Sequence, residues 1–271
     1  MTTGRAPDPA EGASEDPAEG ADGVATGRST DPAGDPPEDP PEDPAGNQAA
    51  GRFLVRFDRV ERTLHWVNAG LFAILILTGA ALSLTPLMAL VGRRLLVEQI
   101  HLGAGLALPG PFALAVAGRW GRGLRRDLSR LNRWTEDDRR WFAALGRSWS
   151  VRRYLRADLL LGKFNPGQKL NAAFTAGGTL VMLASGCMLH WFSPFPLSWR
   201  AGATFVHNWL ALVFFVVITA HVCLALADRQ ALGSMVRGTI SRAWARVHAP
   251  AWLEEMDAER RSAMAARSAE E

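Results

Sequence analysis

Four long stretches without a charged residue constrain this chain more than any other feature. They are Leu64–Thr85, Gln99–Gly118, Leu170–Phe192 and Ala201–Ala227, and none contains Asp, Glu, Lys or Arg. A helix over each stretch would span about 30 Å or more, which is the thickness of the hydrocarbon core of a bilayer. The pattern predicts an all-α integral membrane protein with a bundle of four transmembrane helices, and it excludes an ordinary soluble domain.

The second stretch is the least regular of the four. It contains Pro109 and Pro111, and Glu98 lies just before it. Proline removes a backbone hydrogen bond, yet membrane helices tolerate it where neighbouring helices satisfy the freed carbonyls. We therefore expect this span to cover about residues 95–118 and to be kinked at the prolines.

The chain outside the spans divides into unlike parts. Residues 1–50 hold twelve acidic and two basic residues, nine of the 16 prolines and no aromatic residue. This composition buries too little apolar surface to offset the entropy of ordering, so it predicts a disordered tail. Residues 51–256 form the predicted transmembrane domain, with a long loop at 119–169. Residues 257–271 form a charged C-terminal tail.

The distribution of basic residues predicts the orientation in the membrane. Twelve arginines, Lys163 and Lys169 lie in the loop 119–169. The same side carries Arg52, Arg56, Arg59 and Arg62 before the first span and Arg229, Arg237, Arg242 and Arg246 after the fourth. The opposite side carries Arg93, Arg94 and Arg200. Because positive loops stay in the cytoplasm, both termini and the loop are expected there. Since these bases flank membrane spans, they do not indicate a nucleic-acid partner.

Histidines within the apolar runs are the candidate functional residues, because ionisable groups inside a membrane are costly. His207 and His221 lie fourteen residues apart, so they fall within about 40° of one helix face and about 21 Å apart along it. Each needs a partner at its own depth. His65 opens the first run on the inner side and is paired with His221. His101 lies near the outer end of the second run and is paired with His207.

Two imidazoles that face each other across a helix bundle are typical axial ligands of haem b. A bare metal ion fits less well, because no carboxylate or thiolate accompanies either pair. For a single histidine, an interhelical hydrogen bond is about as good an explanation. The arrangement as a whole predicts two haems b, an inner one held by His65 and His221 and an outer one held by His101 and His207. Two histidines, His190 and His248, have no partner in this scheme.

Several segments resemble the gamma subunit of membrane-bound formate dehydrogenase, a di-haem cytochrome b. These segments are Arg62–Trp66, Gln99–His101, Gly162–Lys169, Val206–His207, Ala220–His221 and Ser241–Trp252. The resemblance covers about residues 52–256 and leaves out the acidic tail. It implies a four-helix bundle of the di-haem cytochrome b type, in the cytoplasmic membrane of a bacterium, with the four histidines ligating the haems as paired above.

The resemblance also implies a quinone site and partners. The family's quinone pocket corresponds to Asn165, Gly167 and Gln168, beside the inner haem, with menaquinone or ubiquinone as the electron acceptor. From the residues alone, the Asn-Pro-Gly-Gln stretch is better explained as a turn that precedes a helix. In the family, electrons arrive at the outer face from an iron–sulfur beta subunit, fed by a molybdenum- or tungsten-containing alpha subunit that oxidises formate. The chain itself would carry no catalytic residue for formate oxidation.

Other functions remain compatible with the sequence. The chain would also suit the cytochrome b subunit of a hydrogenase, a thiosulfate reductase or another quinone-linked respiratory complex. A different class is a haem-free membrane anchor or a transporter that uses its histidines for proton relay. The identity of co-purifying subunits separates the first group, and a b-type absorption spectrum excludes the second.

Overall fold

The computed structural model describes residues 52–147 and 159–270. The predicted acidic tail at 1–50 and residues 148–158 of the predicted loop lie outside the described residues. The elements are β1 (Phe53–Val55), α2 (Arg59–Ser83), α3 (Thr85–Val91), α4 (Arg94–Ala107), α5 (Pro109–Ala117), α6 (Arg122–Leu131), α7 (Glu136–Arg147), α8 (Pro166–His190), α9 (Leu197–Ala227), α10 (Arg229–Arg237), β2 (Thr239–Ser241), α11 (Arg242–His248) and α12 (Pro250–Glu270).

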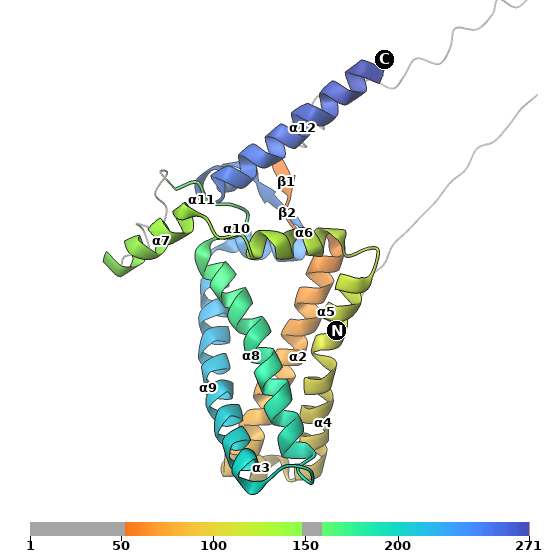
Figure 1. Cartoon of the computed structure of the whole chain (residues 1–271), viewed down its shortest axis with the longest axis vertical. Coiled ribbons are helices and arrows are strands. Elements are labelled where there is room, and N and C mark those ends of the chain that lie inside the picture. The colour runs from red at the N-terminus through yellow and green to blue at the C-terminus, as the bar shows by residue number, and fades with distance from the viewer. Residues whose placement is uncertain (1–51, 148–158, 271) are drawn as a thin grey trace, which may run out of the picture. The chain divides into compact units, whose positions relative to one another are not determined.

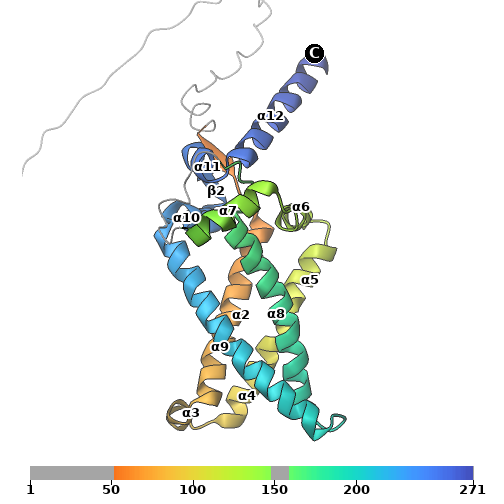
Figure 2. The ribbon, with the colours of Figure 1, turned by 60° about the vertical axis from the view of Figure 1, so that its left-hand side comes forward.

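Four helical segments are long and apolar enough to cross a membrane, namely α2, α4 with α5, α8 and α9. They run side by side, and α6, α7 and α10 to α12 gather at one end of them (Figures 1 and 2). Helix α2 packs mainly against α4, and α8 packs mainly against α9. The predicted fold class, an all-α bundle of four transmembrane helices, is confirmed.

All four spanning helices begin earlier than the charge-free runs, and two of them, α2 and α8, have side-chain caps at their first turns. Asp58 caps α2, and its carboxylate accepts from the backbone N–H of Glu61 while the Glu61 side chain accepts from the N–H of Asp58. Asn165 and Gln168 make the same reciprocal pair at the start of α8. Such a capping box satisfies two backbone donors that the helix leaves open. The Asn-Pro-Gly-Gln stretch, which the sequence suggested as a turn before the third span, therefore forms the N-cap and first turn of α8.

The sequence predicts a kink at the two prolines, and the structure divides the second span there. Helix α4 ends at Ala107 and α5 begins at Pro109, with Leu108 between them. Proline at the first position of α5 has no N–H to donate back into α4. The second span is consequently built from two helices.

Small residues lie between the spanning helices. The buried residues of the bundle include Ala81, Ala104 and Ala203, whereas Leu77 and Leu180 are 71% and 66% exposed. In a membrane, helices associate by close packing of small residues, because burying a leucine from lipid gains little. Many of the large apolar side chains of the bundle are accordingly directed outwards, although Phe214 is buried between helices.

The end of the bundle where α2 and α8 begin and α9 ends is called here the arginine-rich end. Strands β1 and β2 pair antiparallel there, with Leu54 opposite Ile240. A compact apolar core lies beside them and comprises Ile240, Trp244, Ala245, Ala249, Trp252 and Leu253. The predicted C-terminal tail from residue 257 is helical up to Glu270, as the continuation of α12.

Candidate functional site

Two histidine pairs lie inside the bundle at different depths along α9. The ring centroids of His65 on α2 and His221 on α9 are 6.3 Å apart. Those of His101 on α4 and His207 on α9 are also 6.3 Å apart. The structure therefore brings together the pairs that the spacing of the sequence predicts, and α9 contributes one histidine to each.

The separation of the rings in each pair is compatible with a metal ion between them. Two imidazoles joined directly by an N–H···N hydrogen bond of about 2.9 Å would have centroids at most about 5.2 Å apart, since each nitrogen lies about 1.15 Å from its centroid. A metal ion bound about 2.05 Å from each nitrogen places the centroids about 6.4 Å apart. The observed 6.3 Å matches the second arrangement in both pairs.

The set of donors indicates which kind of metal centre fits. Within residues 52–147 and 159–270, no group of three or more His, Cys, Asp or Glu side chains is placed to hold a metal ion. A bare transition-metal ion would require such a group, because it takes four or more ligands. Haem iron obtains four ligands from the porphyrin and needs only two axial imidazoles from the protein. The residues present therefore fit haem b at each pair.

Hydroxyl groups hold both imidazoles of the pair farther from the arginine-rich end. Nδ1 of His101 lies 2.8 Å from Thr78 Oγ1, and Nδ1 of His207 lies 3.0 Å from Ser185 Oγ. Each hydroxyl donates to a carbonyl one turn earlier in its own helix, at 2.6 Å for Thr78 and 2.7 Å for Ser185. The hydroxyl oxygen is thus an acceptor for Nδ1–H, which leaves Nε2 unprotonated and able to ligate a metal.

A glycine follows each of these hydroxyl residues and makes room for the same imidazole. A Cβ atom on Gly79 would lie 3.4 Å from Cε1 of His101, and one on Gly186 would lie 3.2 Å from Cε1 of His207. Larger side chains at these positions would press on the rings. The dipeptides Thr78-Gly79 on α2 and Ser185-Gly186 on α8 therefore form matching cradles for the two histidines.

Neither cradle was predicted from the sequence. The only indication was a hydroxyl residue followed by glycine in two of the apolar runs, and such dipeptides are common. Which side chains these dipeptides face depends on how the helices are rotated against one another. Among the described residues, His65 and His221 have no comparable hydrogen-bond partner. His65 instead contacts the edge of Trp66, with centroids 5.4 Å apart.

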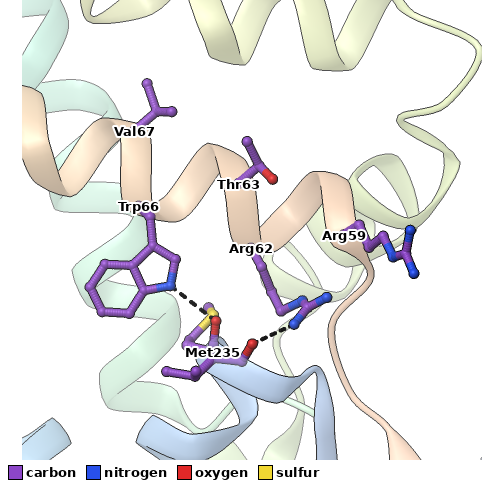
Figure 3. A pocket seen from close by; sticks show the side chains of 7 residues that line it. Arg59, Arg62, Thr63, Trp66, Val67 and Met235 are labelled. Atoms are coloured by element: carbon purple, nitrogen blue, oxygen red, sulfur yellow. Dashed lines mark hydrogen bonds between the residues drawn. The ribbon is translucent and has the colours of Figure 1, made fainter.

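Two residues close to His65 in the sequence, Arg62 and Trp66, attach α2 to α10. Trp66 Nε1 donates to the Met235 carbonyl at 3.1 Å, and the Arg62 guanidinium donates to the Val236 carbonyl (Figure 3). These carbonyls belong to the last turn of α10, where helical partners are lacking and a cation is favoured. The contacts fix the rotation of α2 at the turn that carries His65. They also form the floor of a shallow pocket that Arg59 and Val67 complete.

The capping box at the start of α8 determines how the predicted quinone residues are oriented. Asn165 Oδ1 accepts from the Gln168 N–H at 2.9 Å, and Gln168 Oε1 accepts from the Asn165 N–H at 3.0 Å. Each amide oxygen therefore uses one of its two acceptor positions in the cap. The NH₂ groups take no part in the capping box, so the turn can also donate to carbonyl oxygens.

Gly167 lies under an aromatic ring of α7. A Cβ atom on Gly167 would lie 3.4 Å from Cη2 of Trp141, so the absence of a side chain lets the indole approach the turn. Trp141 contacts Phe142 edge to face, with centroids 5.2 Å apart. The three predicted quinone residues thus lie together beside an aromatic group that the sequence did not place there.

The two lysines beside this turn are buried in ion pairs. Lys163 Nζ donates to Asp127 of α6, and Lys169 Nζ donates to Asp138 of α7 at 2.7 Å. The lysines are 7% and 5% exposed. Burial lowers the pKa of the Lys163 ammonium, and the Asp127 carboxylate opposes that shift. The two pairs attach α6 and α7 to the start of α8.

The remaining histidines and the two cysteines belong to neither pair. His190 contacts Trp191 edge to face, at a centroid distance of 4.9 Å. His248 stacks on Trp244 at 4.5 Å in the apolar core of the arginine-rich end. Cys187 and Cys223 are both free.

Comparisons with known proteins agree with this geometry. A family model described as prokaryotic cytochrome b561 matches residues 56–238. The cytochrome b556(fdo) subunit of formate dehydrogenase from Escherichia coli strain K12 is 26% identical over 211 residues, which cover 75% of this chain and 93% of that protein. The cytochrome b556(Fdn) subunit of the nitrate-inducible formate dehydrogenase of that strain is 25% identical over 100 residues, 36% of this chain and 46% of that protein.

The family match spans the four apolar helices and all four paired histidines. The family implies haem b, and the ring separations in both pairs fit it. The similarity to formate dehydrogenase cytochrome b subunits also confirms the resemblance that the sequence motifs indicated. The chain belongs to the prokaryotic cytochrome b561 family and is a membrane electron-transfer cytochrome b.

Proposed function

We propose that this chain is the membrane-anchor and electron-transfer subunit of a formate dehydrogenase complex, in which it passes electrons through two haems b to a quinone on the cytoplasmic side. The observation that carries the proposal is the pair of histidine sites along α9, each with ring centroids 6.3 Å apart. The similarity to formate dehydrogenase cytochrome b556 subunits supports the choice of complex.

Two haems b, when bound, supply reversible one-electron transfer. His65 and His221 hold the inner one, and His101 and His207 hold the outer one. The two ligands on α9 are separated by about 21 Å along the helix axis, so the two sites lie towards opposite sides of the bilayer core. Thr78 and Ser185 fix the tautomers of the outer pair.

The orientation follows from the charges at the two ends. The arginine-rich end faces the cytoplasm because positively charged segments are retained there. Both termini then lie on the cytoplasmic side of the bacterial cytoplasmic membrane. The opposite end then faces outwards, where the iron–sulfur beta subunit docks and delivers electrons from the molybdenum- or tungsten-containing alpha subunit. The chain contributes no residue to formate oxidation.

The quinone, menaquinone or ubiquinone, binds at the first turn of α8 and accepts hydrogen bonds from the amide groups of Asn165 and Gln168. The support is their capping box, which orients both side chains and in which neither NH₂ group takes part. Gly167 lets Trp141 approach the same turn.

Purification from the native host tests the function directly. We expect the chain to co-purify with an iron–sulfur subunit and a formate-oxidising subunit, and to carry two haems b that formate reduces and quinone reoxidises. Co-purification of a hydrogenase or thiosulfate reductase would assign the chain to that complex instead. Folded protein without a b-type reduced-minus-oxidised spectrum would contradict the haem assignment.

The amide donors of the quinone site are tested by acidic replacements. Asn165→Asp and Gln168→Glu keep the oxygens that cap α8 but remove the NH₂ donors, so the helix start is preserved. Each variant loses a hydrogen bond worth about 0.5–1.5 kcal/mol and adds a negative charge that disfavours a carbonyl oxygen, so quinone reduction should slow by about tenfold. The measurement is quinone reduction by the full complex, with haem content as a check.

A matched control separates the donor from the cap. Asn165→Ser keeps a side-chain acceptor without the amide or a new charge, because serine is a good N-cap residue. It should show a smaller, several-fold loss. Wild-type quinone turnover and unchanged affinity for quinone-like inhibitors in all three variants would place the quinone elsewhere.

The hydroxyl cradles of the outer pair give a spectroscopic prediction. Thr78→Val or Ser185→Ala removes the acceptor for Nδ1–H, so the imidazole becomes a weaker electron donor and the oxidised iron is less stabilised. The midpoint potential of the outer haem should rise, and its affinity should fall by about 10- to 100-fold. Redox titration of the purified chain measures the shift.

Thr219→Val is the control for the cradles. The Thr219 hydroxyl on α9 donates to the Phe215 carbonyl, and among the described residues it makes no hydrogen bond with an imidazole. The variant should leave both potentials unchanged. Equal shifts in Thr219→Val and Ser185→Ala would mean that the effect comes from helix packing and not from the histidine contact.

A further inference from the structure

Three phenylalanine rings pack together inside the bundle and are called here the phenylalanine layer. Phe214 on α9 is 5% exposed and lies at the centre of the layer. The centroid of its ring is 5.5 Å from that of Phe72 on α2 and 4.9 Å from that of Phe174 on α8. Aromatic rings at these separations are in direct packing contact. Three of the spanning helices therefore meet at this layer through aromatic side chains.

The layer lies halfway between the two histidine pairs. On α9, Phe214 follows His207 by seven residues and precedes His221 by seven residues. Seven residues advance a helix by about 10.5 Å and fall only about 20° short of two full turns. The three side chains therefore share one face of α9, with Phe214 at equal distances from the two histidines along the axis.

Helix α2 repeats the same spacing in the opposite direction. His65, Phe72 and Gly79 are each seven residues apart. His65 belongs to the inner pair, and Gly79 faces the imidazole of His101 in the outer pair, since a Cβ atom on it would lie 3.4 Å from Cε1. Phe72 therefore has the same position on α2 that Phe214 has on α9, midway between the two pairs.

A glycine of α8 makes room for the central ring. A Cβ atom on Gly178 would lie 2.8 Å from Cζ of Phe214 and 3.9 Å from Cζ of Phe174. The first distance is well below the contact distance of two carbon atoms, so Phe214 occupies space that only glycine leaves open. Ser185, which contacts His207, lies seven residues farther along the same face of α8. The register that seats the outer histidine therefore also seats Phe214.

The layer is placed to fill the space between groups bound at the two pairs. An iron with two axial imidazoles carries its other ligands in the plane perpendicular to the line between the rings. This line runs across the bundle from α9 to α2 or to α4, so a macrocycle held there would extend along the bundle, towards the layer. In a membrane, burying a phenylalanine from lipid gains little by itself, so the central position of Phe214 needs another reason.

We propose that the phenylalanine layer, with Phe214 at its centre, is the spacer that couples the two haem sites and provides the packed medium through which electrons pass from the outer site to the inner one. This inference rests on the two haem sites of the proposed function. In each transfer, one electron leaves the reduced outer iron and is taken up by the oxidised inner iron. No bond is made or broken, and the rings keep their own electrons. Such coupling weakens more steeply across empty space than across atoms in contact, so it depends on the packing of the three rings.

The test replaces the central ring in the full complex with Phe214→Leu and Phe214→Ala. Each variant is mixed rapidly with formate in the absence of quinone, and the absorbance of the two haems is followed in time. The outer haem should be reduced at the wild-type rate, whereas reduction of the inner haem should lag several-fold in Phe214→Leu and more in Phe214→Ala. Both midpoint potentials should stay at their wild-type values, because the imidazoles and their hydrogen-bond partners are unchanged. A slower transfer at unchanged potentials reports the medium between the sites.

Gly178→Ala displaces the ring without removing it. The added methyl group would lie 2.8 Å from Cζ of Phe214, so this variant should lose stability and should also slow the transfer. The double variant Gly178→Ala with Phe214→Leu gives the methyl group the space of the lost ring. Its thermal stability should recover because the two positions are in contact and their effects are coupled, whereas the transfer should remain slow. Recovery of the transfer rate together with stability would mean that packing alone is responsible, which contradicts the proposal.

Phe215→Ala is the matched control, because Phe215 is the next residue of α9 and is 51% exposed. It should leave the transfer rate unchanged. A further readout does not involve electron transfer. Removal of the Phe214 ring leaves an apolar cavity, and such cavities stay dry and bind xenon, so a structure of Phe214→Ala under xenon should show the gas between the two sites. Xenon bound there together with a wild-type transfer rate would refute the role of the layer.

The outcomes also distinguish this inference from the proposed function. If the Phe214 and Gly178 variants carry two haems that formate reduces and the transfer between them keeps its wild-type rate, only the spacer is refuted. If the wild-type protein lacks a second haem, the proposed function fails, and the spacer fails with it. Loss of a haem from every Phe214 and Gly178 variant would show that the layer supports haem binding and not coupling, which also overturns the inference.

Discussion

The His207→Ala variant is expected to retain one haem b per chain instead of two, and the haem that remains should be the one held by His65 and His221. His101→Ala should give the same result. His65→Ala and His221→Ala should each remove the other haem. The reason is geometric: in the proposed sites each iron would take two protein ligands, and the two ring centroids lie 6.3 Å apart in each pair. Haem content and redox titration of the purified variants measure the outcome.

His190→Ala is the matched control, because His190 contacts Trp191 and belongs to neither pair. It should bind two haems. If His65→Ala and His207→Ala removed the same haem, the pairing would be wrong. If every variant lost both haems, glycine variants supplied with free imidazole would separate the sites, because the added ligand should restore only the haem whose histidine was removed.

The Lys169→Ala variant is expected to lose about 3–5 kcal/mol of stability, because it leaves the Asp138 carboxylate buried without its cation. The side chains of this pair are 6% and 2% exposed, and Lys169 also donates to the Arg133 carbonyl at 2.8 Å. The loss should be concentrated in α7, which the pair attaches to α8. Thermal unfolding in detergent and limited proteolysis between α6 and α8 provide the measurements.

Replacing both partners tests whether the unpaired charge causes the loss. In the wild type the Asp138 carboxylate accepts from the Thr135 N–H at 2.7 Å. The double variant Lys169→Met with Asp138→Asn keeps an oxygen for this hydrogen bond but removes both charges. This double variant should recover most of the stability. Arg139→Ala, which removes an exposed ion pair with Glu136, should change stability by less than about 1 kcal/mol. A loss in the double variant equal to that of Lys169→Ala would mean that packing of the lysine stem is responsible.

The sequence predicts the parts of the site that depend on one helix at a time. The charge-free runs locate the spans, and the fourteen residues between His207 and His221 place both rings on one face of α9. The depth of each histidine within its run then identifies its partner. These inferences need only the rise and rotation of a helix, which are independent of the rest of the molecule.

The parts that sequence analysis missed depend on how separate segments meet. Thr78 and Ser185 look like ordinary hydroxyl residues until α2 and α8 are rotated against α4 and α9. Lys163 and Lys169 are recognised in the sequence only as basic residues of the loop, but each lies in an ion pair with an acid 36 or 31 residues earlier in the chain. Pairing at that distance is decided by the way in which α6 and α7 fold back onto α8.

Helix α9 carries one histidine of each pair, whereas α2 and α4 carry one histidine each. A one-residue insertion between His207 and His221 would rotate one imidazole by about 100° relative to the other from their present arrangement, so that only one could still face its partner. An insertion of seven residues would nearly restore the alignment but would move the two sites about 10.5 Å farther apart. Among relatives of this protein, substitutions within residues 207–221 can accumulate, but insertions and deletions there should be eliminated. Differences in chain length should therefore occur in the loops at either end of α9.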